Sequence, residues 1–381
     1  MRRFLSIAAV GAACACAAPQ DEAAEAADTS EGAEDALTAA SGVDDPFEVR
    51  VSSDRVVWAT DEGVFSAPKR SSGWGWWPSA RPTHVVKGKL GDGARFGPTF
   101  AVDGDAVFAI ADGKLVKAAV AGGPSTPYGF ALPEVGGVVV DAAHVYLSAK
   151  DGVYRAPKDF AGPPSKLGGF SCASSFDRSV RQLTSDDDAV YLVACGDRLL
   201  RIEKASGATA TLLATGTISS IAVDGGTLYL LGEGELRSMP ATGGAPTPLL
   251  SGTDTHSLAV SSGTILLSSI SKLVRLDAAT GQTRTLATHG ATIGFPPWAT
   301  KLGALKDVAI DGADYYYALG NTRPVTGPWP DDPNPRTGKI GYERSGERAR
   351  VGAPRDPRSC SRTSKGETTP PEREKMNAHG S

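Results

Sequence analysis

The chain has 381 residues and a formal net charge of −4, with 43 acidic and 39 basic side chains. Acidic and basic residues nearly balance between about 46 and 340, and no basic stripe follows any segment there. Nucleic acids and anionic membrane surfaces attract proteins through clustered Lys and Arg. We therefore expect no nucleic acid partner and no membrane contact other than a lipid anchor.

The N-terminus reads as an export signal over residues 1–18. Met1-Arg-Arg is followed by an apolar stretch that is too short to span a bilayer, and then by small residues around Cys14 and Cys16. Two hypotheses stay open: signal peptidase cleaves at Ala15-Cys16-Ala17, or Cys14 or Cys16 becomes the lipidated first residue of a bacterial lipoprotein. The sequence thus predicts an exported protein of the periplasm or cell envelope. Lipidation would make it an outer-membrane lipoprotein, and the alternative is a secreted protein.

Residues 19–45 are rich in Ala, Glu, Asp, Ser and Thr and contain no basic residue. Such a composition does not bury enough apolar surface to offset the entropy of the chain. We expect a disordered acidic tether, which favours the lipoprotein hypothesis.

Seven similar sequence segments follow. Each starts with Val, Ile or, in one case, Ser, continues with Asp or Ser and small turn residues, and ends with an apolar or aromatic pair. Their starts are spaced 37 to 51 residues apart. They begin at Val51, Val102, Val140, Ser185, Val223, Val260 and Ile310. Repeats of this length are typical of propeller blades.

Each repeat has short apolar runs separated by turns such as Asp112-Gly113 and Gly122-Gly123-Pro124. Asp-Gly between apolar runs favours a tight hairpin. Four strands and three turns make one antiparallel blade, and neighbouring blades must stack because one sheet alone leaves a face uncovered. The sequence predicts an all-β protein with a β-propeller over residues 46–340. We count six clear blades plus an incomplete seventh, with a six-bladed ring as the alternative.

The repeats also resemble a known family in the pattern Asp-x-x-x-Val-Tyr, followed by Gly-x-Val-x-Arg and a glycine pair. The pattern is similar to the YWTD-type propellers of the low-density lipoprotein receptor family, and to secreted bacterial proteins with related repeats. The full tetrapeptide is missing from the sequence, so the resemblance implies the fold and suggests ligand binding. The residues that carry it are Trp58, Tyr146, Tyr191 and Tyr229, with Arg155, Arg201, Arg237 and Arg275.

The seventh repeat starts well, but a polar, proline-rich loop then runs from Asn321 to Gly338, and Lys339-Ile340 starts the expected third strand. From residue 341 the repeat pattern ends. Residues 341–381 form either a disordered tail or an aberrant one, produced by a shift of the coding frame near Ile340. In both cases we expect the last blade to lack a clear outer strand.

The residue types that bind metals or carry catalysis show no recognisable spacing, so we expect no metal and no cofactor. Asp186-Asp187-Asp188 falls on a hairpin turn, and we interpret it as a solvated turn rather than a calcium site. Cys172 and Cys195 flank a hairpin-like segment of the fourth repeat, and export favours a disulfide between them.

In a propeller the first strand of each blade lines the central channel. The residue three positions before each repeat start therefore falls at the channel mouth. This ring is Glu48, Thr99, Gly137, Gln182, Ser220, Ser257 and Asp307, and one position earlier lie Arg181, His256 and Lys306. Such a mouth suits a small polar ligand or water.

Two long insertions fall on the same face, and they contain Trp298 and Trp329. Exposed tryptophans on loops are typical binding anchors, although both can equally be buried under their own loops. A third aromatic insertion, Trp74-Gly-Trp76-Trp77, falls on the opposite face.

The favoured hypothesis is an exported, tethered and monomeric propeller that binds a protein or another envelope component through its loops. The hypothesised ligand-binding residues are Glu48, Arg181, Gln182, His256, Lys306, Asp307, Trp298 and Trp329. One alternative is a lyase or hydrolase that acts in the channel, with Glu48, His256 and Asp307 as acid–base groups. The other is a purely structural envelope protein.

Overall fold

The structure is a computed structural model of the 381-residue chain. It describes residues 37–43, 46–69, 82–90, 98–133, 135–172, 182–194, 198–214, 216–269, 271–288, 305–319 and 338–344. Every regular element within these ranges is a β-strand. A search of the same residues finds no helix that is long and apolar enough to cross a membrane.

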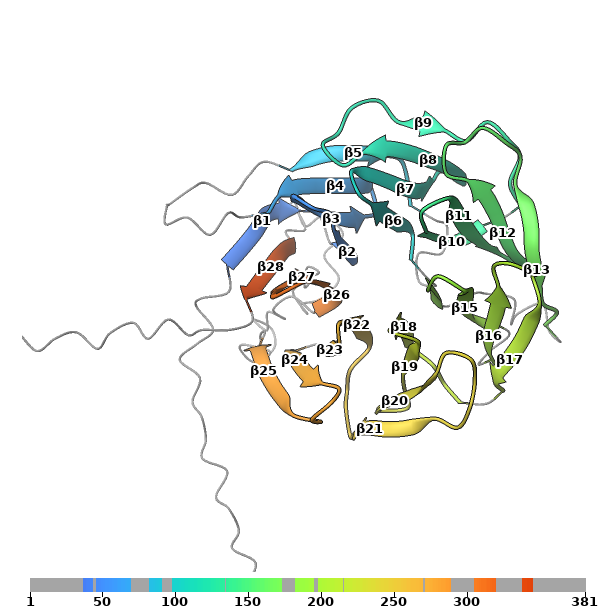
Figure 1. The fold of residues 1–381 in the computed structure, drawn as a ribbon. Helices are drawn as coiled ribbons and strands as arrows, with labels where there is room; N and C mark the ends of the chain where they lie inside the picture. Colours follow the sequence, from blue (N-terminus) through green and yellow to red (C-terminus); the bar gives the residue numbers. More distant parts are fainter. Residues whose placement is uncertain are drawn as a thin grey trace, which may run out of the picture.

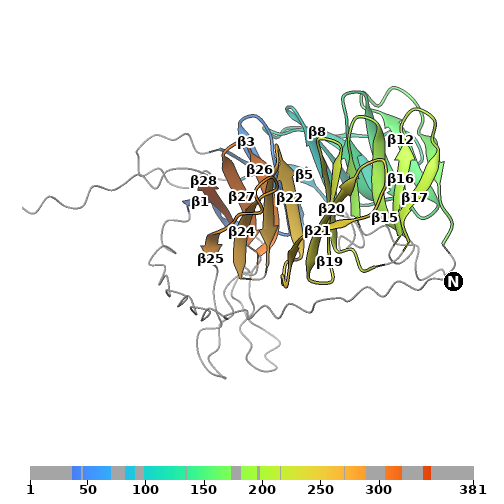
Figure 2. The same ribbon diagram turned by 60° about the horizontal axis from the view of Figure 1, so that its bottom comes forward.

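The described strands form seven four-stranded antiparallel sheets, which stand around a central axis as the blades of a propeller (Figure 1). In Figure 2 the ring is turned, and the strands run between its two faces. The all-β propeller expected from the repeats is therefore confirmed. The seventh blade, expected to be incomplete, has four strands.

Blades one to three are each built from consecutive strands, which follow one another from the channel outward. Blade one consists of β2 (Glu48–Val51), β3 (Arg55–Thr60), β4 (Gly63–Pro68) and β5 (Thr83–Lys87). Blade two consists of β6 (Phe100–Asp103), β7 (Ala106–Ala111), β8 (Lys114–Ala119) and β9 (Thr126–Pro127). Blade three consists of β10 (Val135–Val140), β11 (His144–Ala149), β12 (Gly152–Pro157) and β13 (Ser165–Gly169).

Blades four to six follow the same plan. Blade four consists of β14 (Gln182–Ser185), β15 (Ala189–Ala194), β16 (Arg198–Glu203) and β17 (Thr209–Leu213). Blade five consists of β18 (Ser220–Asp224), β19 (Thr227–Gly232), β20 (Glu235–Pro240) and β21 (Thr247–Ser251). Blade six consists of β22 (Ser257–Ser261), β23 (Thr264–Ser268), β24 (Lys272–Asp277) and β25 (Thr283–Thr288).

Blade seven combines both ends of the chain. Its inner strands are β26 (Leu305–Asp311), β27 (Asp314–Leu319) and β28 (Gly338–Arg344), and its outer strand is β1 (Leu37–Val43). β1 pairs antiparallel with β28, so that Leu37 lies opposite Tyr342 and Val43 lies opposite Gly338.

This pairing corrects two boundaries predicted from the sequence. The expected tether, 19–45, contains the strand β1, and the expected tail, 341–381, begins with the last four residues of β28. The expectation that blade seven lacks an outer strand was wrong, because that strand comes from the opposite end of the chain. The start of β28 next to Lys339 agrees with the predicted third strand.

Apolar side chains fill the spaces between the blades. All six residues of β15 are buried, because the neighbouring blades cover both faces of its sheet. Among the described residues, each of the seven interfaces between adjacent blades has its own cluster of buried apolar side chains. The interface between blades seven and one holds Trp58 and Tyr316, both almost fully buried. The ring is therefore closed by packing as well as by strand pairing.

The recurring pattern of the repeats has a direct structural cause in blades three and four. The Oδ1 atom of Asp141 accepts hydrogen bonds from the backbone N–H groups of Ala143 and His144, and its Oδ2 atom accepts one of 2.8 Å from the Tyr146 hydroxyl. Asp186 binds its own turn and the Tyr191 hydroxyl in the same way. The Asp therefore holds the first hairpin turn and the second strand together.

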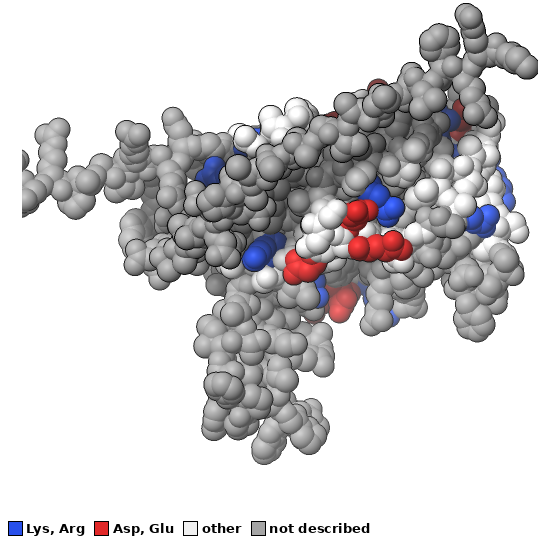
Figure 3. All heavy atoms as spheres, turned by 90° about the horizontal axis from the view of Figure 1, so that it is seen from below, with Lys and Arg blue, Asp and Glu red and all other residues white. Residues whose placement is uncertain are grey.

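An ion pair between adjacent blades recurs at the end of the inner strand. Asp141 of blade three pairs with Lys204 of blade four at 2.8 Å, and Asp103 of blade two pairs with Lys158 of blade three. Asp311 of blade seven pairs with Lys69 of blade one at 2.5 Å, so the closing interface uses the same contact. Figure 3 shows one side of the ring, on which acidic and basic side chains lie interspersed among the described residues.

Candidate functional site

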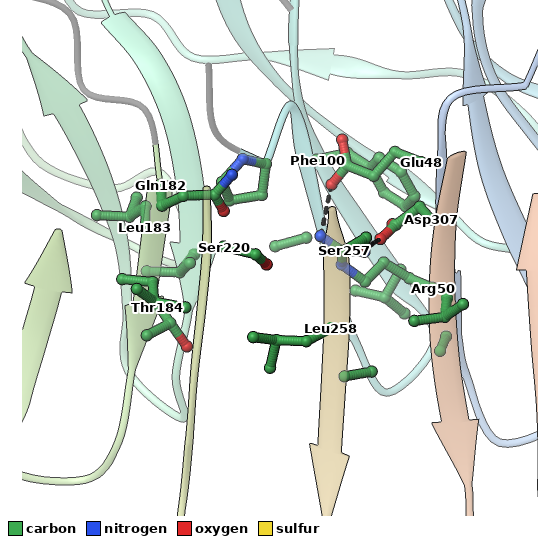
Figure 4. A pocket seen from close by; sticks show the side chains of 18 of the residues that line it. Glu48, Arg50, Phe100, Gln182, Leu183, Thr184, Ser220, Ser257, Leu258 and Asp307 are labelled. Carbon is green, nitrogen blue, oxygen red and sulfur yellow. Dashed lines mark hydrogen bonds and ion pairs between the residues drawn. The ribbon is translucent and has the colours of Figure 1, made fainter. Parts of the chain in front are cut away.

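The inner strands surround a cavity of about 570 Å³ at the centre of the ring. Short runs of consecutive residues on the inner strands line it, such as Gln182–Ser185 and Lys306–Ile310. Figure 4 shows the two sides of the cavity. One side carries Glu48, Arg50, Phe100, Ser257 and Asp307, and the other carries Gln182, Leu183, Thr184 and Ser220.

Most of the predicted mouth residues gather in this cavity. Five blades that are far apart in sequence supply them, which only a ring allows. The cavity is lined by Glu48, Gln182, Ser220, His256, Ser257, Lys306 and Asp307. Three hypothesised site residues, Arg181, Trp298 and Trp329, lie outside the described residues. Their roles stay predictions.

Arg50 joins two carboxylates on one wall of the cavity. Its Nη2 atom donates a hydrogen bond of 2.7 Å to Glu48 Oε1, and its Nη1 atom donates one of 2.9 Å to Asp307 Oδ2. The guanidinium also lies over the ring of Phe100, 5.7 Å from the ring centroid. Charged hydrogen bonds of this kind are stronger than neutral ones.

The same carboxylates connect the blades around the mouth. Glu48 Oε2 accepts hydrogen bonds of 2.8 Å and 2.7 Å from the backbone N–H and the hydroxyl of Thr99, next to blade two. Asp307 accepts one of 3.0 Å from the backbone N–H of Val49 and one of 2.7 Å from the Ser257 hydroxyl. Asp307 thereby ties blade seven to both of its neighbours.

Burial raises the pKa of Glu48, and the nearby charge of Asp307 acts in the same direction. Arg50 and the hydrogen bonds from Thr99 oppose the rise without cancelling it. Desolvation penalises a carboxylate because its charge loses contact with water. Ionised Glu48 thus occupies an unfavourable environment that its donors only partly compensate.

All four carboxylate oxygens of Glu48 and Asp307 accept hydrogen bonds from neighbouring groups. Through their bonds to Thr99, Val49 and Ser257 the two carboxylates have a structural role between blades. The other proposed group, His256, is half-buried in the cavity wall, and its backbone N–H bonds the carbonyl of Ser268.

The opposite wall is neutral and polar. The side-chain amide of Gln182 donates a hydrogen bond of 2.9 Å to the backbone carbonyl of Ser219, which connects blades four and five. Thr184, two positions along the strand, and Ser220 of blade five add hydroxyl groups. Lys306, an exposed residue beside Asp307, also lines the cavity.

Sequence reasoning missed Arg50, which is central to this arrangement. The signal was present, because Arg50 lies two positions after Glu48 and the period of a strand places both on the same face. The equivalent position in the other blades is mostly small or apolar. In blades two, six and seven, for example, it is Ala101, Ala259 and Ala309.

The remaining site predictions have mixed outcomes. Asp186 is engaged in its own hairpin turn, as expected for that cluster. No group of three or more His, Cys, Asp or Glu side chains in the described part of the chain is arranged to hold a metal ion. Cys195, Cys14 and Cys16 lie outside the described ranges, so the disulfide with Cys172 and the lipid anchor stay predictions.

Comparisons with known proteins agree on the fold. No protein-family model matches this sequence, and no curated protein matches it. Several solved structures match with TM-scores just above 0.5. The extracellular domain of a putative hybrid two-component system from B. thetaiotaomicron has a TM-score of 0.54 and 12% identity, and the match covers 82% of this chain and 40% of that one. A putative one-component system domain from the same organism gives a TM-score of 0.52 and 12% identity, with 80% and 41% covered.

A third structure, described as YCF48 bound to D1 peptide, has a TM-score of 0.52 and 8% identity, and the match covers 82% of this chain and 96% of that one. This chain spans less than half of the two B. thetaiotaomicron chains, but nearly all of YCF48. At sequence identities this low, the structural similarity shows a common architecture and nothing beyond the fold. The protein is a β-propeller with a polar cavity at the centre of its ring.

Proposed function

We propose that this protein is an exported binding protein that takes up its ligand at the mouth of its central channel. The observation that carries the proposal is the polar cavity of about 570 Å³, which is lined by residues of all seven blades. Binding sites for small molecules are concave, have volumes of this order and hold a few convergent polar groups. The geometry favours binding over catalysis because the carboxylates are engaged in holding the blades together.

The structural neighbours give this proposal a context. One is an extracellular domain of a bacterial regulatory system, and another was solved with a peptide bound. Because a propeller hosts many functions, the likeness supports a binding role without specifying a ligand. In our proposal a protein or another envelope component is the partner of the intact chain, and Trp298 and Trp329 contribute to that contact.

Export and anchoring are part of the proposal and rest on the N-terminal sequence. The signal over residues 1–18 directs the chain to the envelope, and Cys14 or Cys16 carries the lipid. A single acyl chain binds membranes weakly, whereas several chains hold a protein firmly. The double variant Cys14→Ser, Cys16→Ser is expected to leave the membrane fraction. Mature protein that starts at Ala18 without lipid would support simple secretion instead.

Ligand binding is tested by thermal unfolding of the intact chain with fractions of a small-molecule extract of bacterial envelopes. A ligand that binds only the native state raises the melting temperature by mass action. We expect one fraction to raise it, and the double variant Gln182→Ala, Lys306→Ala to lose this rise. Lys114→Ala, which removes an exposed charge outside the cavity, is the control. An equal rise in the double variant would contradict the proposal.

A protein partner is tested separately, by capture from native membranes. Trp298→Ala and Trp329→Ala are expected to weaken capture and to leave the small-molecule effect unchanged. If these variants instead lower the melting temperature of the free protein strongly, the two tryptophans are packing elements and the loop-binding hypothesis is wrong.

A further inference from the structure

The charged wall of the cavity, formed by Glu48, Arg50, Lys306 and Asp307, has more free hydrogen-bond donors than free acceptors. Its formal charges cancel, because Glu48 and Asp307 balance Arg50 and Lys306. Most of its acceptor sites are occupied, because Glu48 Oε2 and Asp307 Oδ2 each accept two hydrogen bonds from the protein, and only Glu48 Oε1 and Asp307 Oδ1 accept a single one. A ligand therefore meets few acceptors on this wall.

The donors on the same wall are not exhausted. A guanidinium has five N–H donors. Within the described part of the chain, Arg50 uses three of them, toward Val49 O, Glu48 and Asp307. Its side chain is 34% exposed although it lines the cavity, and Lys306 adds an exposed ammonium group. Because donors remain beside acceptors that are mostly occupied, this wall selects a ligand that is rich in acceptors.

The opposite wall completes the chemical profile. The carbonyl oxygen of the Gln182 side chain accepts hydrogen bonds, and the hydroxyls of Thr184 and Ser220 both accept and donate them. These groups carry no charge and suit hydroxyl groups of a ligand. One side of the cavity thus fits an anionic group, and the other fits a hydroxylated body.

We propose that the cavity binds a small hydroxylated carboxylate, such as a sugar acid, with the carboxylate on Arg50 and Lys306 and the hydroxyls on Gln182, Thr184 and Ser220. This inference rests on the proposed binding function and specifies its ligand class. A guanidinium matches the planar geometry of a carboxylate. A carboxylate, with its single negative charge, is repelled less by Glu48 and Asp307 than a doubly charged phosphate is.

The test is titration calorimetry of the intact chain with D-glucuronate and with D-glucose. The two sugars differ only in a carboxylate that replaces a hydroxymethyl group. We expect glucuronate to bind at least tenfold more tightly than glucose, because a charged hydrogen bond contributes roughly that factor. Inorganic phosphate is the third probe, and it is expected to bind more weakly than glucuronate.

Lys306→Met is the main variant, because Lys306 is exposed and its removal leaves the bonds among Glu48, Arg50 and Asp307 in place. It is expected to weaken glucuronate binding about tenfold and to leave glucose binding and the melting temperature unchanged. Lys114→Met, which removes the same charge outside the cavity, should change none of these values. Arg50→Lys is a second variant that keeps the charge but loses the planar donors, and it should also weaken glucuronate binding.

The outcomes separate this inference from the function on which it rests. Equal affinity for glucose and glucuronate, lost in Gln182→Ala and kept in Lys306→Met, would overturn the carboxylate preference and leave the binding function standing. Tighter binding of phosphate than of glucuronate would overturn the assignment of the anionic group. No binding of any of the three probes, together with a rise in melting temperature by an envelope fraction, would overturn the ligand class alone. If no envelope fraction acts either, both proposals fail.

Discussion

Blades four and seven are built from the same number of strands, but they hold together differently. The strands of blade four follow one another along the chain, whereas blade seven takes its outer strand β1 from residues 37–43 and pairs it with β28. Leu37 and Tyr342, which lie opposite each other, are separated by almost the whole propeller. Forming such a contact requires closing a very long loop, which costs entropy and slows folding.

The inner strands of the two blades also differ in how many hydrogen bonds they make to neighbouring blades. At the channel mouth, Gln182 of blade four makes one neutral hydrogen bond to the next blade. Asp307 of blade seven bonds both neighbouring blades and a guanidinium. Of these two blades, the one with less help from chain continuity therefore makes more polar contacts to its neighbours at the channel mouth.

Deleting residues 37–43 is expected to have the largest effect, because it exposes the edge of β28 and leaves blade seven with three strands. An uncovered strand edge is a template for aggregation. We expect loss of cooperative unfolding or a melting temperature lowered by at least about 10 °C, which is the size of a change of several kcal/mol. Circular dichroism and light scattering measure both. Deleting residues 19–36 instead is the control, and an equal effect of the two deletions would contradict the role of β1.

Tyr316→Ala in blade seven and Leu192→Ala in blade four test whether the apolar interfaces are equally well packed. Both side chains are almost fully buried in their clusters. Each substitution is expected to lower the free energy of unfolding by about 3–4 kcal/mol, measured in urea. A much smaller effect of Tyr316→Ala would show that the interface between blades seven and one is poorly packed.

Asp307→Ala is expected to be more destabilising than Gln182→Ala. The first change removes the acceptor of the Val49 N–H and the Ser257 hydroxyl and one of the two carboxylates bound to Arg50, which costs about 3 kcal/mol. The second removes one neutral hydrogen bond, at a cost of about 1 kcal/mol. Equal effects in urea unfolding would contradict the view that blade seven depends more on its polar contacts.

Asp141 makes the interface between blades three and four sensitive to acid. Burial alone would raise the pKa of Asp141, but Lys204, the Tyr146 hydroxyl and two backbone N–H groups outweigh it and hold the pKa well below its usual range. Since the folded pKa is depressed, the stabilisation is present above the unfolded pKa of about 3.9 and is lost as the pH falls toward the folded pKa. Asp141→Asn is expected to reduce this loss of unfolding free energy at acidic pH, measured by urea unfolding at several pH values. The same loss in the protein and in the variant would contradict the assignment.

Glu48 is expected to show a pH dependence of the opposite sign. Burial raises its pKa in the folded protein, so its contribution to stability is fully present below the unfolded pKa of about 4.3 and falls as the pH rises through the folded pKa. The difference in unfolding free energy between the protein and Glu48→Gln should therefore shift in favour of Glu48→Gln as the pH rises from 4 to 7. A difference that is constant over this range would show that Glu48 is not perturbed.

Much of this protein follows from local sequence. The seven repeats predicted the blades because alternating apolar residues and turn residues act within a few positions of each other. The turn prediction at Asp112-Gly113 is one case, since both residues adopt positive φ, of 50° and 73°, as a tight hairpin turn of this type requires. The mouth residues Glu48, Gln182 and Asp307 were also predictable, because their place relative to each repeat start is constant.

Tertiary structure alone decided the rest. Nothing local marks Leu37–Val43 as the partner of β28, since its sequence lacks the alternation of the other strands and its partner lies at the far end of the chain. The role of Arg50 likewise depends on Asp307 and Glu48, which meet only when the ring closes. Short-range patterns specify the strands and their order, whereas the closing strand and the charged wall of the cavity arise from contacts that no short stretch of sequence contains.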